Sequence, residues 1–280
     1  MNKESAYKKA IEFAKNHYEN FPVISFLIPR KMQKDVAIIY WFARSADDIA
    51  DEGNLSESER LAALNNFEKR LDELLIGNYS NSFEFALGNT IKVRNLSPDN
   101  FYKLISAFKQ DVRKNRYNTF EEIEDYCSRS ANPVGRIILE LFDTREEEAF
   151  ILSDKICTAL QLTNFYQDVM IDIKKGRIYF PLDELKNFKI EENKFLKSQN
   201  NSNLQALVKH NLERTKTLYT DGRKLLKFLR GRLKLEIKWT ILGGEKVLAK
   251  IEKNNYNVFG DWLKLSRIDF MMLLLNSIIK

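Results

Sequence analysis

Apolar residues recur at intervals of three and four along most of this chain, and few residues interrupt the pattern. Positions three or four apart lie on the same face of an α-helix, so this spacing is typical of helices that bury one face. The 280 residues include only ten glycines and five prolines, well under the roughly 12% that the pair usually makes up. Because these residues form turns and end helices, their scarcity favours long helices over sheet. We therefore predict an all-α protein.

The same periodicity places the individual helices. We expect them near residues 4–18, 32–52, 56–76, 82–94, 98–113, 119–129, 133–142, 146–172, 201–229 and 232–254. Turn-forming stretches such as "GNYSNS" and "SANPVG" separate them, and the polar stretch from Asn187 to Asn203 is interpreted as a longer break. Since no fixed repeat, strand-type alternation or linker is found, residues 1–280 are predicted to form a single domain.

Charge and cysteine usage limit the classes of partner. The formal net charge is +6, but 39 acidic residues are interspersed with 45 basic ones, so a nucleic-acid partner is not expected. Cys127 and Cys157 each stand alone, without the spacing of a metal site, which favours buried free thiols in a reducing cytoplasm.

The sequence predicts no membrane-spanning helix. Its apolar tail "FMMLLLNSIIK" is much shorter than the roughly 20 apolar residues that a spanning helix needs. We therefore expect a cytoplasmic protein. The basic, Leu-containing stretch from Gly222 to Lys238 is interpreted as a core-facing helix with a solvated outer face, and docking on the anionic inner face of the membrane is left open.

Acidic residues gather at the end of an apolar run in "DVAIIYWFARSADDIADE". In a helix, Arg44, Asp47, Asp48 and Asp51 project from one side within about two turns. Carboxylates this close repel one another and either take up protons or attract cations. A solvated acidic helix face is the alternative.

A second polar set follows the same spacing in "LTNFYQDVMIDIKKGRIYFP". Asn164, Asp168 and Asp172 stand four and eight positions apart, on one face of a helix whose other faces are apolar. Oxygen ligands without Cys or His suit a hard cation such as Mg²⁺, which also keeps waters and phosphate oxygens in its shell. The two sets together therefore predict binding of Mg²⁺ and a diphosphate.

These motifs resemble those of the squalene and phytoene synthases, the head-to-head branch of the trans-isoprenyl diphosphate synthases. "YWFARSADDIADE" is similar to the first aspartate-rich motif and "LTNFYQDVMIDIKKGRIYFP" to the second, while "YCSRSANPVGRI" resembles the segment that lines the prenyl-chain pocket. "ENFPV", Gln167 and "ILGG" resemble the bacterial hydroxysqualene synthase branch. The resemblance implies a single α-helical bundle around a central apolar cavity.

The resemblance also implies roles for individual residues. Mg²⁺, about two or three ions, is expected on Asp47, Asp48, Asp51, Asn164, Asp168 and Asp172. The residues that match substrate-binding positions or adjoin them are Arg44, His17, Tyr40, Tyr126, Val134, Gln167, Arg177 and Tyr179. His17 has the alternative of an ordinary solvated helix residue. Candidates for the apolar wall also include Phe21, Phe26, Trp41 and Leu160, each with ordinary core packing as the alternative.

The reaction that the resemblance implies starts with metal-assisted loss of diphosphate from a prenyl substrate. In the hydroxysqualene synthase branch, presqualene diphosphate ionises and water captures the cation, so no nicotinamide is expected and enzymes of squalene or hopanoid synthesis are the expected functional partners. Many relatives carry Arg at the position of Gln167, which puts the preceding condensation of two prenyl diphosphates in doubt. Squalene or phytoene synthase activity is the close alternative. A non-catalytic helical assembly factor is the alternative of another class.

Overall fold

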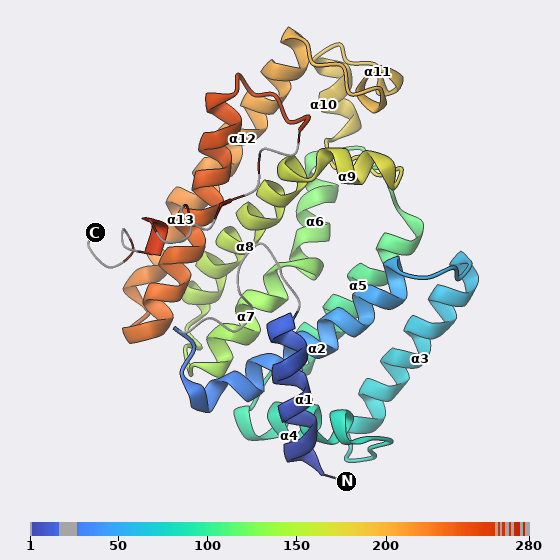
Figure 1. Ribbon diagram of the computed structural model, residues 1–280, viewed down its shortest axis with the longest axis vertical. Helices are drawn as coiled ribbons and strands as arrows, with labels where there is room; N and C mark the ends of the chain where they lie inside the picture. Colours follow the sequence, from blue (N-terminus) through green and yellow to red (C-terminus); the bar gives the residue numbers. More distant parts are fainter. Residues whose placement is uncertain are drawn as a thin grey trace. The chain divides into compact units, whose positions relative to one another are not determined.

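The computed structural model describes residues 2–16, 27–260, 263, 265, 266, 269, 272–274 and 277. Every element within these residues is helical, which confirms the all-α prediction. The elements, whose α-helices are labelled in Figure 1, follow in the order α1 (Lys3–Asn16), α2 (Arg30–Asp51), α3 (Glu57–Leu75), α4 (Ser82–Arg94), α5 (Pro98–Arg113), α6 (Phe120–Ser130), α7 (Asn132–Leu141), α8 (Glu147–Gln167), α9 (Val169–Lys174), α10 (Leu182–Asn187), α11 (Glu192–Leu196), α12 (Ser202–Gly222), the 3₁₀ helix η1 (Arg223–Lys227) and α13 (Gly231–Lys253).

Contacts divide the chain into two compact units. Unit 1 holds residues 1–113, 133–150 and 231–233, and unit 2 holds residues 114–132, 151–230 and 234–280. The boundaries fall at the end of α5, within α7 and α8, and at and within the start of α13. A single domain around a central cavity therefore stays a prediction, and each unit is described by itself below.

In unit 1, α2 packs against α1, α3, α4 and α5. Its apolar residues are buried nearly all round, as the dense run before the acidic cluster predicts; Ile38 is fully buried and Phe42 is 2% exposed. The ring of Phe42 lies 5.0 Å from that of Phe67 on α3 and 5.2 Å from that of Phe101 on α5. Burial on several sides fixes the position of α2, and with it the acidic cluster at the C-terminal end of the helix.

In unit 2, α8 and α12 are joined by buried polar side chains. The Tyr219 hydroxyl on α12 lies 3.0 Å from the Thr163 hydroxyl on α8, and Tyr166 donates to Asn211 Oδ1 at 3.3 Å. Gly244 of α13 lies against Tyr219, where a Cβ would be 1.9 Å from the hydroxyl oxygen. Unit 2 therefore holds the C-terminal half of α8, around Asn164, by packing from α12 and α13.

The helices differ by more than two residues from the sequence-based prediction at three places. The helix expected over 146–172 is interrupted at Asp168, and the one expected over 201–229 ends at Gly222 and continues as η1. The stretch interpreted as a break contains α11, and α10 ends at its first residue, Asn187. Helices of five or six residues are too short to show a 3.6-residue period, so the apolar pattern could not reveal them.

The basic stretch from Gly222 to Lys238 is also divided, because η1 ends at Lys227 and α13 begins at Gly231. Its Leu225, Leu229 and Leu233 are buried, as predicted for the core-facing residues. Both cysteines are free thiols: Cys127 is buried, but Cys157 is only half-buried. Burial raises the pKa of the Cys127 thiol, so this sulfur is an inert core group.

Candidate active site

The last two turns of α2 bring Arg44 together with three carboxylates. Its guanidinium lies 3.1 Å from Asp47 Oδ2, 2.6 Å from Asp48 Oδ1 and 2.6 Å from Glu52 Oε1. Arg44 Nε and Asp48 Oδ1 are both inaccessible to solvent, and their contact is an ion pair outside hydrogen-bond geometry. The structure thus confirms that Arg44, Asp47 and Asp48 share one side of the helix, and it adds Glu52 to the group.

These carboxylates lie at the electrostatically unfavourable end of the helix. The C-terminus of α2 carries the negative end of the helix dipole, and its last turn has no basic residue. Arg44, one turn earlier, therefore offsets much of the negative charge. The side chains of Asp47 and Asp48 remain 38% and 36% exposed, so both can be reached by a ligand.

The donor set on α2 fits a hard divalent cation. Its ligating atoms are carboxylate oxygens, and Asp47 and Asp48 converge on one positive group, the Arg44 guanidinium. Among the residues that the structure describes, no three His, Cys, Asp or Glu side chains form a preassembled cation site. A cation bound here would therefore share these two carboxylates with Arg44 or replace it.

The second set lies at a break between α8 and α9 in unit 2. Asp168 leaves helical geometry, with φ −103° and ψ 16°. Hydrogen bonds of helical spacing nevertheless cross the break, because Asp168 N donates to Asn164 O at 2.8 Å and Asp172 N to Asp168 O at 2.9 Å. Asn164, Asp168 and Asp172 thus stay one turn apart, and all three are half-buried.

Backbone hydrogen bonds hold the segment that follows α9. Arg177 N donates to Asp172 O at 2.8 Å, and Ile178 N donates to Asn115 O at 3.1 Å. The turn between Asp172 and Arg177 uses Gly176 at φ +72°, a conformation that glycine adopts without steric cost. These contacts explain why a Gly-Arg pair follows the second acidic set, since they return Arg177 toward Asp172.

Four aromatic rings pack together next to this segment. Tyr179 stacks on Phe165 with centroids 3.8 Å apart, and the rings of Tyr117 and Tyr126 lie 5.7 and 6.2 Å from that of Tyr179. Asp172, Arg177, Phe165 and Tyr179 also line one small hollow of unit 2. The structure therefore brings together four residues predicted for the site, Tyr126, Asp172, Arg177 and Tyr179, and adds Tyr117 and Phe165.

The remaining predicted residues lie as follows. Tyr40 is half-buried with its ring 6.0 Å from that of Phe13, Val134 is 44% exposed, and Gln167 is buried. Leu160 is half-buried in α8. His17, Phe21 and Phe26 lie outside the described residues.

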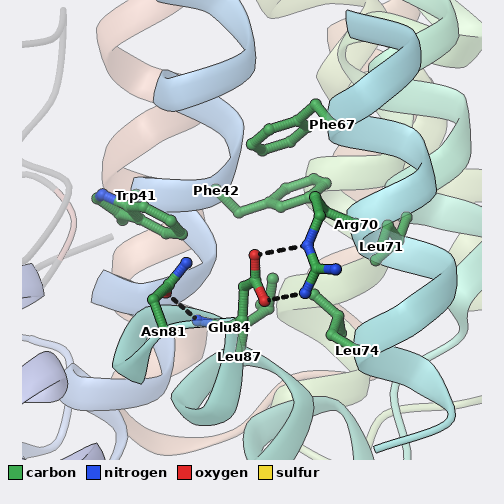
Figure 2. Close-up of a pocket in the computed structure, with 9 residues that line it drawn as sticks. All are labelled: Trp41, Phe42, Phe67, Arg70, Leu71, Leu74, Asn81, Glu84 and Leu87. Atoms are coloured by element: carbon green, nitrogen blue, oxygen red, sulfur yellow. Dashed lines mark hydrogen bonds and ion pairs between the residues drawn. The ribbon is translucent and has the colours of Figure 1, made fainter. Parts of the chain in front are cut away.

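Unit 1 also contains a cavity of about 190 Å³ between α2, α3 and α4, shown in Figure 2. Phe42, Phe67 and leucines form most of its wall, and the Arg70 guanidinium is paired there with Glu84 at 2.6 and 3.1 Å. Trp41, predicted for the prenyl cavity, lines this space and stacks on Phe83. Because Glu84 neutralises Arg70, nothing in the lining favours an anionic ligand.

The Glu122 carboxylate helps to hold the backbone segment that supports Arg177. Hydrogen bonds from Lys114 Nζ and from Asn118 N lower the pKa of Glu122 from 4.5 to about 2. These bonds fix residues 114–118, to which the backbone of residues 178–183 is hydrogen-bonded. Because the pKa of Glu122 is lower in the folded than in the unfolded chain, its ionised carboxylate stabilises the fold at neutral pH. This contribution is lost as the pH falls from about 4.5 to about 2 and the carboxylate takes up a proton.

We therefore predict that Glu122→Gln lowers the free energy of unfolding at pH 7 by about 1 kcal/mol or less, because this carboxylate is partly exposed. The difference from the unsubstituted protein should narrow as the pH falls from about 4.5 to about 2. Urea unfolding across this range measures it. Glu213→Gln, an exposed carboxylate 4.0 Å from Lys209, is the control and should have little effect at any pH. A difference that does not change with pH would contradict the assignment.

Comparison with known families matches residues 14–269 to the squalene/phytoene synthases. The chain belongs to the squalene/phytoene synthase family. It is 29% identical to the 15-cis-phytoene synthase of Synechocystis sp., over 91% of this chain and 79% of that one. It is 36% identical to the hydroxysqualene synthase of Zymomonas mobilis, over 62% of this chain and 59% of that one.

One solved structure is similar to this chain in both fold and sequence. The squalene synthase HpnC from Alicyclobacillus acidocaldarius superposes with a TM-score of 0.86 at 34% identity, over 91% of this chain and 96% of that one. The squalene/phytoene synthase fold, predicted from the two acidic motifs, is thereby confirmed. Within the part of the chain that the structure describes, no helix has the length and apolarity of a membrane span.

Proposed function

We propose that this squalene/phytoene synthase is a Mg²⁺-dependent enzyme that ionises presqualene diphosphate and adds water to the cation, giving hydroxysqualene. The observation that carries the reaction type is the higher identity to a hydroxysqualene synthase, 36%, than to a phytoene synthase, 29%. Because the 36% match covers 62% of the chain, the reaction itself needs a direct test. No nicotinamide is required, since the product is not reduced.

The metal ligands we propose are Asp47, Asp48 and Asp51 on α2, and Asn164, Asp168 and Asp172 on α8 and α9. Their oxygen donors and partial exposure support this assignment. When bound, Mg²⁺ supplies Lewis-acid stabilisation of the charge on the departing diphosphate. Arg44 and Arg177, each beside an acidic set, contribute further positive charge for the diphosphate oxygens.

The aromatic residues of unit 2 have a separate proposed role. A carbocation must be shielded from random water, and the rings of Tyr117, Tyr126, Phe165 and Tyr179 form a largely buried apolar wall beside Asp172 and Arg177. A cation held over the face of one such ring is stabilised by about 0.5–2 kcal/mol. One water molecule admitted to the cation then adds to it and loses a proton, which gives the alcohol.

Two alternatives remain as proposals. Head-to-head condensation of two prenyl diphosphates is favoured by the phytoene synthase match, which covers 91% of the chain, and by HpnC, which is described as a squalene synthase. A non-catalytic assembly factor that retains the fold would need neither acidic set, yet all acidic positions of both motifs are present. We also propose a cytoplasmic enzyme that works with other enzymes of squalene or hopanoid synthesis and can dock peripherally on the membrane.

Mass analysis of the products separates these functions. The purified protein with Mg²⁺ should convert presqualene diphosphate to hydroxysqualene, with or without a nicotinamide. Parallel incubations with farnesyl diphosphate and with geranylgeranyl diphosphate test the first condensation. Formation of squalene or phytoene from these substrates would show that the protein condenses two prenyl diphosphates, and the proposed function would be wrong. If no substrate gives a product, the non-catalytic assembly factor is favoured.

A further inference from the structure

Arg60, in the first turns of α3, donates hydrogen bonds to the end of α2 and to the loop after it. Nη1 donates to Ile49 O at 2.9 Å and to Glu52 O at 2.8 Å. Nη2 donates to Gly53 O at 2.8 Å, and Nε donates to Leu55 O at 3.2 Å. One guanidinium thus contacts four main-chain carbonyls, and two of them, at residues 49 and 52, flank Asp51.

The carbonyls of Ile49, in the last turn of α2, and of the C-cap residue Glu52 lie where a helix leaves carbonyls without a partner. They also carry the negative end of the helix dipole, next to carboxylates that already repel one another. A positive planar group with several donors suits this position better than a single ammonium, because its donors point in fixed directions. Arg60 therefore reduces the electrostatic cost of ending an acidic helix here and fixes the last turn in place.

The loop between α2 and α3 is fixed at both ends. Glu52 N donates to Asp48 O at 2.9 Å, and Gly53 follows at φ +76°, the left-handed conformation that commonly ends a helix. Ser56 begins α3 with a capping box, in which Ser56 N donates to Glu59 Oε2 at 2.8 Å. Arg60 lies one residue beyond this box, so its own position is set by α3.

We propose that Arg60 is a positioning residue that holds Asp51 and the last turn of α2 in the geometry required for divalent-cation binding. It acts through the backbone and contacts no carboxylate of the acidic cluster in the described structure. The inference rests on the proposed metal-dependent function. It predicts that Arg60 determines cation affinity, beyond any contribution to folding stability.

Direct metal binding tests this role without relying on turnover. The affinity for Mn²⁺ in the presence of inorganic diphosphate is measured by electron paramagnetic resonance for the unsubstituted protein and for Arg60→Gln and Arg60→Lys. Arg60→Gln should weaken binding about 10-fold or more, the loss typical when a group that orients metal ligands is removed. Arg60→Lys should weaken it less, because the charge remains while the fixed set of donors is lost.

Arg145 offers a matched control in the same unit. It donates to Arg94 O at 2.9 Å and to Glu140 O at 3.3 Å, so it joins main-chain carbonyls as Arg60 does, but at the ends of α4 and α7. Arg145→Gln should lower thermal stability and leave Mn²⁺ affinity unchanged. In kinetics, only Arg60→Gln should raise the Mg²⁺ concentration for half-maximal turnover, with kcat largely recovered at saturating Mg²⁺.

The possible outcomes distinguish failure of the metal-dependent function from failure of the role proposed for Arg60. If the unsubstituted protein binds no Mn²⁺, the metal-dependent function is wrong and the role of Arg60 is wrong with it. If the unsubstituted protein binds Mn²⁺ and Arg60→Gln binds it equally well, or if Arg145→Gln weakens binding by the same factor, only the role of Arg60 is overturned. Should Arg60→Gln not fold, Arg60→Lys provides the same comparison.

Discussion

Replacing Asp48 by alanine should leave the squalene/phytoene synthase fold intact while lowering turnover of its prenyl diphosphate by about 10²–10³-fold. The Asp48 carboxylate is 36% exposed and pairs with Arg44, which keeps Asp47 and Glu52 as partners in the variant. Its loss also relieves repulsion between neighbouring acids, so the free energy of unfolding should change by about 1 kcal/mol or less. Steady-state kinetics together with thermal unfolding measure the two effects.

Asp168→Ala is expected to behave in the same way, because its half-buried side chain lies in the second acidic set. Asp99→Ala is the control: its exposed carboxylate pairs with Lys103 on the surface of α5, and turnover should be unchanged. Undiminished product formation by Asp48→Ala or Asp168→Ala would remove the assignment of metal ligands. A variant that loses activity only by unfolding would also fail to support it.

Gly244→Ala should destabilise the protein by about 2–3 kcal/mol, although glycine-to-alanine changes inside helices usually stabilise by up to about 1 kcal/mol. The new methyl carbon would lie 1.9 Å from Tyr219 Oη, 2.7 Å from Tyr219 Cζ and 3.2 Å from Leu160 Cδ2. Tyr219 is fully buried and hydrogen-bonded to Thr163, so it cannot swing aside. Helix α13 must move away from α12 instead. Urea unfolding measures the loss.

A double substitution tests the stated cause. Phenylalanine at position 219 removes the oxygen of the 1.9 Å contact but keeps the ring carbon of the 2.7 Å contact. Gly244→Ala combined with Tyr219→Phe should therefore be less destabilised than the sum of the single variants, by about 1 kcal/mol. If Gly244→Ala is as stable as the unsubstituted protein, the close approach of α12 and α13 is wrong.

The helical fold could be predicted because most of these helices are long and amphipathic. The ends of α4 and α5 match the expected residues, 82–94 and 98–113. The prediction was wrong where local geometry breaks a favourable pattern, as at Asp168, and where helices are too short for periodicity, as in α10 and α11. A break at an acidic residue that keeps helical hydrogen bonds on both sides has no signature in the order of residue types.

The candidate site was predictable to the extent that its residues repeat at helical spacing. Arg44, Asp47 and Asp48 are neighbours because a helix places positions three and four apart together. Glu52 was missed although it stands four positions after Asp48, because it is the C-cap residue that follows the last turn of α2. Tyr117 was missed because it belongs to no set of helical spacing. Arg60 was missed because, within "SESER", it looks like an ordinary surface residue of α3, and only its contacts with the carbonyls of α2 distinguish it.

The sequence by itself determined the helical class, the two acidic sets and the family, because each depends on residues that are close along the chain. Only the tertiary structure decided which distant segments support those sets: α3 provides Arg60 for the end of α2, and residues 115–118 hold the segment that carries Arg177 and Tyr179. Such contacts involve main-chain carbonyls and amides, which every residue carries. Their pairing depends on packing in three dimensions and leaves no pattern of side-chain types to recognise.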